Sequence, residues 1–131
     1  SGYKNLLCRE DILSGLNFSA EDLRLQMERE LKSKWLHTRL AVLEQQQKPK
    51  LLAETLKLSI LAILPVLKGF CYLGDRVIPN ATEDLCAQVS DISKQNLSLI
   101  NSWLMLDKAD IYIIKNYLEI LQGLLTYLDT M

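Results

Sequence analysis

The sequence predicts an all-α fold, an up-down bundle of four to five helices whose second helix is kinked at Pro65. Apolar residues recur at spacings of three and four over long stretches, as on the buried face of a helix. No stretch shows the alternation of apolar and polar residues that is typical of a half-buried strand. The 131 residues, 49% of them hydrophobic, suffice for one domain with one core. We expect residues 1–18 to be a lead-in or linker and residues 19–131 to form a single helical bundle domain.

Caps and prolines give the bounds of the two long N-terminal helices. Ser19 begins the first, because the aspartate three residues later can complete a capping box, and the helix runs to about Gln47. Pro49 begins the second at a first-turn position, where its missing N–H costs nothing, and Gly74 ends it. Pro65 lies inside the second helix, where it removes a backbone hydrogen bond and predicts a kink or a short break.

The C-terminal half is expected to hold a third, a fourth and a fifth helix. Asn80 or Thr82 caps the third helix, which ends near Lys94. A short fourth helix covers about residues 97–106, residues 107–110 form a turn, and the last helix runs from there to the C-terminus.

Composition narrows the environment and the classes of partner. The formal net charge of -1 disfavours a general nucleic-acid binder, which would be basic, so we expect no nucleic-acid partner. Three cysteines in unpaired spacing do not make a disulfide framework, which indicates a reducing, cytoplasmic location. The most apolar stretch contains only ten residues between Lys57 and Lys68, well short of the roughly 20 that span a bilayer, so we expect a buried core helix and no membrane partner.

The last helix carries two apolar seams where a surface helix needs only one. One interpretation is a central helix of the bundle that is packed on both sides. The other is that one seam forms a subunit or domain interface, which would make the chain a homodimer. The first seam comprises Ile111, Ile114, Leu118, Leu121, Leu125 and Leu128. The second, the candidate interface seam, comprises Ile113, Tyr117, Ile120, Leu124 and Tyr127.

The first helix carries a charged row between two apolar arcs. At about 100° per residue, Met27, Leu31, Trp35 and Val42 share one arc, and Leu25, Leu36, Leu40 and Leu43 share another on nearly the opposite side. The row between them consists of Glu28, Lys32 and Arg39. Its residues are either ordinary surface ion pairs or contacts to a ligand or a neighbouring domain.

The motifs of common enzyme classes are absent from the sequence. His37 is the only histidine, which disfavours a zinc site, and there is no G-x-S-x-G turn, P-loop or G-x-G-x-x-G. Helical ribonucleases of the HEPN type carry an arginine four to six residues before a histidine, a spacing that this chain lacks. We therefore predict no catalytic residue, no metal and no cofactor, and expect that this chain alone is not an enzyme.

Three stretches, at residues 27–39, 64–74 and 77–85, resemble the C-terminal helical half of bacterial two-domain proteins whose N-terminal domain is nucleotidyltransferase-like, of the polymerase-beta type. The resemblance covers about residues 20–131, and this chain departs from the pattern at Ser33, where the group tends to have glycine, and at His37. The matching positions are Glu28, Arg29, Glu30, Leu31, Lys32, Lys34, Arg39, Pro65, Gly74 and Pro79.

The resemblance implies a non-catalytic accessory domain whose partner is the nucleotidyltransferase-like domain of the same protein. Such a domain would contribute to the substrate cleft, to a dimer contact, or to both, and the row Glu28, Lys32 and Arg39 is the candidate cleft or domain contact. The alternative is a free-standing helical interaction module that homodimerises through the last helix.

Overall fold

The structure is a computed structural model that describes residues 19–131, and within that range the expected all-α helical bundle is confirmed. The expected lead-in, residues 1–18, lies outside the described residues. The helices are α2 (Ala20–Gln45), α3 (Pro49–Leu73), α4 (Thr82–Ser93), α5 (Ile100–Trp103) and α6 (Ile111–Thr130).

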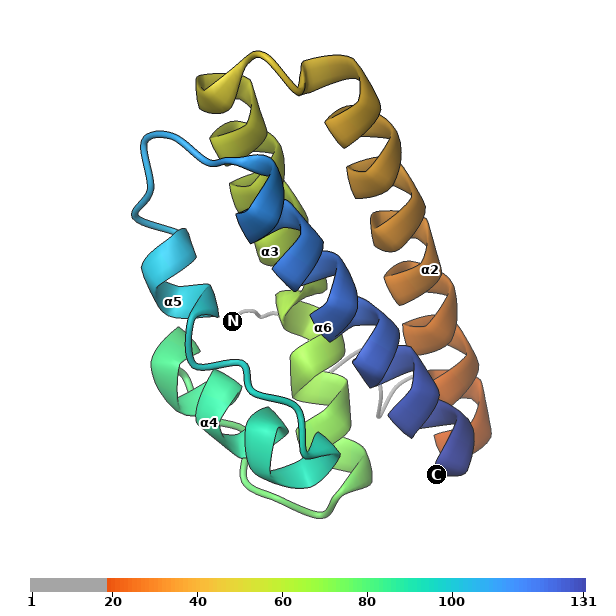
Figure 1. The fold of residues 1–131 in the computed structure, drawn as a ribbon. Coiled ribbons are helices and arrows are strands. Elements are labelled where there is room, and N and C mark those ends of the chain that lie inside the picture. The colour runs from red at the N-terminus through yellow and green to blue at the C-terminus, as the bar shows by residue number, and fades with distance from the viewer. Residues whose placement is uncertain (1–18) are drawn as a thin grey trace.

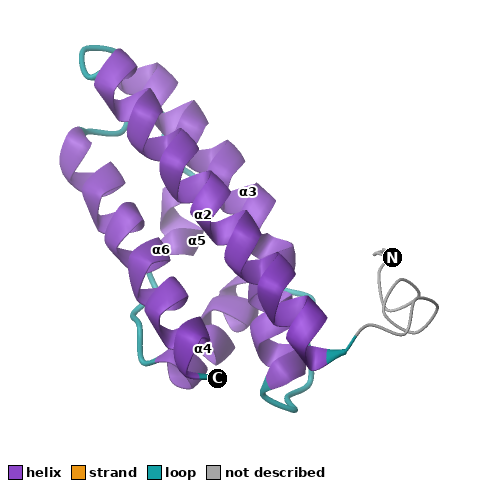
Figure 2. Ribbon diagram, turned by 90° about the vertical axis from the view of Figure 1, so that its right-hand side faces the viewer, coloured by secondary structure: helices purple, strands orange, loops and turns teal. Residues whose placement is uncertain are grey.

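The bundle is built on the three long helices α2, α3 and α6. Helix α2 runs antiparallel to both α3 and α6 and packs against both of them (Figure 1). The short helices α4 and α5 pack against α3 on the side away from α2, and they return the chain to the start of α6 (Figure 1). Figure 2 shows α2 and α3 side by side along their length, so one side of this pair faces away from the rest of the bundle.

A single apolar cluster holds these helices together. Its largest fully buried side chains include residues of α2, α3, α5 and α6 but none of α4. Trp103 of α5 packs edge-on against Tyr117 of α6, with the ring centroids 6.3 Å apart. Burial of large apolar side chains is the main stabilising term of such a bundle. These side chains include Leu31, Leu56, Ile60, Leu67, Phe70, Ile100, Ile114, Tyr117 and Leu121.

Polar contacts fix the register of the α2–α3 hairpin. The Thr38 hydroxyl donates to the Ser59 hydroxyl at 3.2 Å, and the Thr55 hydroxyl donates to the Gln45 side chain at 2.9 Å. Farther along, a Cβ on Gly69 would lie 2.7 Å from the Met27 sulfur, so the missing side chain lets α2 approach α3. Because α2 and α3 are antiparallel, two of their residues lie at the same height when their residue numbers add up to about 97, as those of Thr38 and Ser59 do.

The predicted starts of α2 and α3 are confirmed, and α6 begins with a cap that sequence analysis did not single out. Ser19 and Asp22 form the complete capping box, with the Ser19 hydroxyl accepting from the Asp22 N–H at 3.0 Å. Pro49 occupies the first position of α3, and the Asp110 carboxylate caps α6 by accepting from the Ile113 N–H at 3.0 Å. Helix α2 ends at Gln45, two residues before the expected end.

Helix α3 continues through Pro65, so the predicted short break does not occur. The proline ring removes the hydrogen bond that would reach the carbonyl of Leu61. Pro65 and Leu61 are both exposed, so water can reach the carbonyl that loses its partner.

The link between α3 and α4 begins as expected at Gly74, the C-cap of α3, but its other end differs from the expectation. Gly74 follows the last helical residue, but Asp75 takes the left-handed conformation (φ 57°), and the N–H of Arg76 reaches back to the carbonyl of Cys71 at 2.9 Å. Helix α4 has Ala81 at its N-cap position and no side-chain cap, so neither Asn80 nor Thr82 caps it.

The fourth helix is a single turn, Ile100–Trp103, and not the expected span of residues 97–106. In the residues before it, side-chain oxygens accept the backbone N–H hydrogen bonds. The Asn96 side-chain oxygen accepts from the Ser98 N–H at 3.0 Å, and the N–H of Leu97 donates to the Ser90 hydroxyl at 2.9 Å. Asparagine and serine compete with a helix in this way, so the helix begins later.

Replacing Lys94 by glycine is expected to stabilise the protein by about 0.5–1 kcal/mol. Lys94 ends α4 in the left-handed conformation (φ 62°), which glycine adopts without a steric cost. Urea unfolding monitored by circular dichroism measures the difference, and Lys115→Gly, inside helix α6, is the opposite control because glycine there is expected to destabilise. A loss of stability in Lys94→Gly would contradict the prediction.

Candidate functional site: the outer face of helices α2 and α3

The predicted charged row lies on the surface of α2. Lys32 donates to Glu28 with the Lys32 nitrogen 2.9 Å from the carboxylate oxygen, one helical turn apart. The hydrogen bond to Lys32 and its positive charge lower the pKa of Glu28, and the same hydrogen bond raises the pKa of Lys32. These two residues therefore satisfy each other, as the surface ion-pair interpretation requires.

The third member of the row, Arg39, makes a different contact. Its guanidinium lies over the Trp35 ring, 5.2 Å from the ring centroid. Trp35 is half-buried against the core, while Arg39 itself is exposed. Stacking on the ring holds the guanidinium close to the surface of α2.

Beside this row, the second apolar arc of α2 is exposed. Leu25, Leu36, Leu40 and Leu43 have between 45% and 64% of their surface accessible. The opposite arc, with Met27, Leu31 and Val42, is buried in the core. Helix α2 thus has one apolar arc that the bundle covers and one that it does not.

Helix α3 adds a second set of exposed apolar residues, which sequence analysis did not single out. Leu51, Leu58, Leu61 and Tyr72 have between 40% and 67% of their surface accessible. The antiparallel register places Tyr72 level with Leu25 and Leu61 level with Leu36, and it places Leu58 one residue away from the level of Leu40.

We call these residues the outer face: Leu25, Leu36, Leu40 and Leu43 of α2 together with Leu51, Leu58, Leu61 and Tyr72 of α3. Scattered exposed leucines need no explanation, but a row of exposed apolar residues along each of two neighbouring helices is typical of a protein interaction site.

A small cavity of about 280 Å³ opens between α2 and α3 at the level of Leu58. Lys34 and His37 line it from α2, and the hydroxyls of Thr38 and Ser59 belong to the buried floor. The Ser59 hydroxyl also contacts the Tyr117 hydroxyl at 2.7 Å, so a chain of three hydroxyls leads from this cavity into the core. Burial raises the pKa of Tyr117, which remains a neutral phenol at neutral pH.

The candidate interface seam of the last helix belongs to the core. Tyr117, Ile120 and Leu124 are buried within the chain, and Ile113 and Tyr127 are half-buried against the same cluster. Helix α6 is packed on both sides, by α2 and by α3 and α4. This seam is therefore not a surface that a second subunit could reach in the folded chain, and the central-helix interpretation describes α6.

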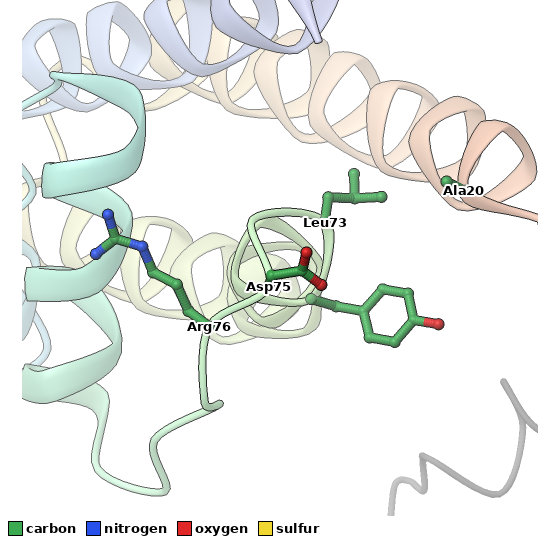
Figure 3. A pocket seen from close by; sticks show the side chains of 5 residues that line it. Ala20, Leu73, Asp75 and Arg76 are labelled. Carbon is green, nitrogen blue, oxygen red and sulfur yellow. The ribbon is translucent and has the colours of Figure 1, made fainter.

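A second cavity, of about 390 Å³, lies where α3 ends beside the start of α2. Ala20, Leu73, Asp75 and Arg76 line it together with Tyr72 (Figure 3). The Arg76 side chain turns toward α4, where it pairs with Asp91 at 2.6 Å and with Gln88 at 2.9 Å. Its charge joins α4 to the end of α3, which is a structural role.

The other reactive side chains give no chemical centre in the part of the chain that the structure describes. Burial raises the pKa of the Cys86 thiol to about 11 and also raises the pKa of Cys71, so both are neutral core residues. Among residues 19–131, no three His, Cys, Asp or Glu side chains come together in a group that could hold a metal ion. His37, the only histidine, is exposed on α2.

Within the described residues, α3 is the one helix long and apolar enough to cross a membrane, judged by length and composition. Half of its most apolar 18-residue window is buried inside the bundle. The core helices of water-soluble bundles have the same property.

Comparisons with protein-family models, with curated proteins and with solved structures give no match to this chain. Its function is therefore inferred from its own residues and their arrangement.

Proposed function

We propose that this chain is a non-catalytic helical accessory domain that binds a neighbouring protein domain through the outer face. The observation that carries this proposal is the row of four exposed leucines on α2, opposite an arc of the same helix that is already buried in the core. Exposed apolar side chains arranged along one helix lose contact with water when a partner covers them, and that loss stabilises a complex.

The resemblance supplies the identity of the partner that we propose, a nucleotidyltransferase-like domain of the same bacterial protein. The charged row Glu28, Lys32 and Arg39, which the resemblance marks, lies on the same helix as the exposed leucines. An interface with an apolar centre and charged residues at its rim is the common arrangement between protein domains. A cytoplasmic location belongs to the same proposal.

The alternative is a free-standing interaction module that homodimerises. Because the candidate interface seam is buried, a second copy would have to bind the outer face. Residues 20–73, which form α2 and α3, carry nine Lys and Arg but six Asp and Glu, a net charge of +3. Two copies of a half with the same net charge repel each other, so this observation favours a different partner over a second copy.

The test begins with the mass of the natural gene product, measured by immunopurification with an antibody against this domain and intact mass spectrometry. We expect a product much heavier than 15.0 kDa. The domain that accounts for the additional mass is then produced separately and titrated with the 131-residue chain by isothermal calorimetry. Leu36→Asp/Leu40→Asp is expected to weaken this binding at least about tenfold, and Lys32→Glu/Arg39→Glu is expected to weaken it less.

Val77→Asp is the matched control, because Val77 is 88% exposed and lies outside the outer face. Unchanged binding by Leu36→Asp/Leu40→Asp would overturn the proposal. A natural product near 15.0 kDa that is dimeric by light scattering, and monomeric in Leu36→Asp/Leu40→Asp, would establish the homodimer alternative.

A further inference from the structure

The charges of the protein are divided between its two halves. The α2–α3 half carries a net charge of +3, while residues 74–131 carry four Lys and Arg and eight Asp and Glu, a net charge of -4. Three of the six carboxylates in the first half are already paired along α2, with Arg24, Lys32 and Lys34. The α2–α3 half as a whole therefore carries the excess of positive charge.

We propose that the outer face binds an acidic amphipathic helix, with one carboxylate of that helix in the cavity between α2 and α3. This inference rests on the proposed function and adds the chemistry of the partner. Each of the two leucine-bearing helices provides an apolar track along its exposed side. An amphipathic helix that lies along such a track places apolar residues at every third or fourth position.

The cavity provides a specific contact within this track. Its volume of about 280 Å³ suits a single side chain and falls short of the roughly 300–1,000 Å³ of typical small-molecule sites. Lys34 and His37 stand at its α2 wall, and Leu58, which is 67% exposed, forms part of its α3 wall. A side chain that enters it therefore meets an ammonium group, an imidazole and an apolar wall.

The Lys34 ammonium retains donors for a partner. Its only acidic contact within residues 19–131 is Glu30 at 3.9 Å, which is near the outer limit for an ion pair. An ammonium has three N–H groups, so Lys34 can also donate to a carboxylate in the cavity. A partner helix can supply a carboxylate from an aspartate or a glutamate. Such a carboxylate complements the net positive charge of the α2–α3 half.

The test uses two synthetic, fluorescently labelled helical peptides of about 18 residues, with leucines at i, i+4, i+7 and i+11. One peptide has glutamates beside the leucines and the other has glutamines at the same positions. Fluorescence anisotropy with the 131-residue chain is expected to show at least about tenfold tighter binding of the glutamate peptide at low salt, and this preference is expected to fall as salt is added.

Variants locate the contact. Lys34→Glu/His37→Glu is expected to remove most of the preference for the glutamate peptide, whereas Lys115→Glu, a charge reversal on the exposed side of α6, is expected to keep it. Circular dichroism and thermal unfolding establish that each variant is folded. If Leu36→Asp/Leu40→Asp abolished binding of both peptides, that would further support the apolar track.

The outcomes separate this inference from the proposed function. Equal binding of the two peptides, or no binding of either, would overturn the acidic-helix inference, while the natural domain titration would still decide the proposed function. Binding to phosphatidylglycerol vesicles without binding to the glutamate peptide would also overturn it, because the outer face would then bind an anionic membrane.

Discussion

Leu124→Ala is expected to lower the free energy of unfolding by about 2–5 kcal/mol, and Leu40→Ala is expected to change it by less than about 0.5 kcal/mol. Leu124 is fully buried between α6 and its neighbours, so alanine leaves a cavity there. Leu40 is 47% exposed on α2, where removing methyl groups leaves no cavity. Urea unfolding at neutral pH, with the denaturant slope checked for each variant, measures both changes.

The pair of variants tests the assignment of the two apolar surfaces. Similar losses of stability in both variants would mean that Leu40 is a core residue and that the outer face is not free to bind. If Leu124→Ala lost little stability and changed the protein from dimer to monomer in light scattering, the candidate interface seam of α6 would be an interface after all. Leu36→Ala serves as a second surface control, since Leu36 is 50% exposed.

Periodicity predicted the two arcs of α2 correctly but could not show which seam of α6 was covered. In α2, polar residues separate Leu36 and Leu40 from the core positions, so the pattern itself distinguishes two directions. In α6, both seams are apolar and both are covered, by α2 on one side and by α3 and α4 on the other. Which neighbour covers a seam depends on chain topology, and a single helix does not encode it.

The exposed residues of α3 had no comparable signal. The helix is apolar at nearly every position from Leu58 to Leu67, and this stretch is too short to span a bilayer, which led to the prediction of a buried core helix. Leu58 and Leu61 nevertheless face away from the bundle, because α2 and α4 cover other sides of α3. A helix that is apolar all round is either fully buried or incompletely covered by its own chain, and composition does not separate these cases.

Local signals predicted the helix ends better than they predicted tertiary contacts. The capping box of Ser19 and Asp22 joins residues three positions apart, so the sequence contains the whole motif. The chain of Thr38, Ser59 and Tyr117 hydroxyls joins three helices, and nothing in the spacing of these residues indicates that they meet.

That hydroxyl chain supports the second large prediction, that Ser59→Ala lowers the free energy of unfolding by about 1–3 kcal/mol. The Ser59 hydroxyl contacts Tyr117, whose side chain is fully buried, and accepts from Thr38, which is 2% exposed. Alanine has nearly the volume of serine, so the expected loss comes from the two hydroxyls left without this partner.

A matched triple variant separates this cause from a change in packing. Thr38→Val/Ser59→Ala/Tyr117→Phe removes all three hydroxyls while keeping the shapes of the side chains close to the originals, so no buried hydroxyl loses its partner. We expect its free energy of unfolding to exceed that of Ser59→Ala, because replacing all members of a buried polar group is nearly neutral while removing one is not. A triple variant less stable than Ser59→Ala would mean that the three hydroxyls stabilise the bundle independently. The contact between α2, α3 and α6 at this level would then depend on each hydroxyl separately, and the chain would not act as a unit.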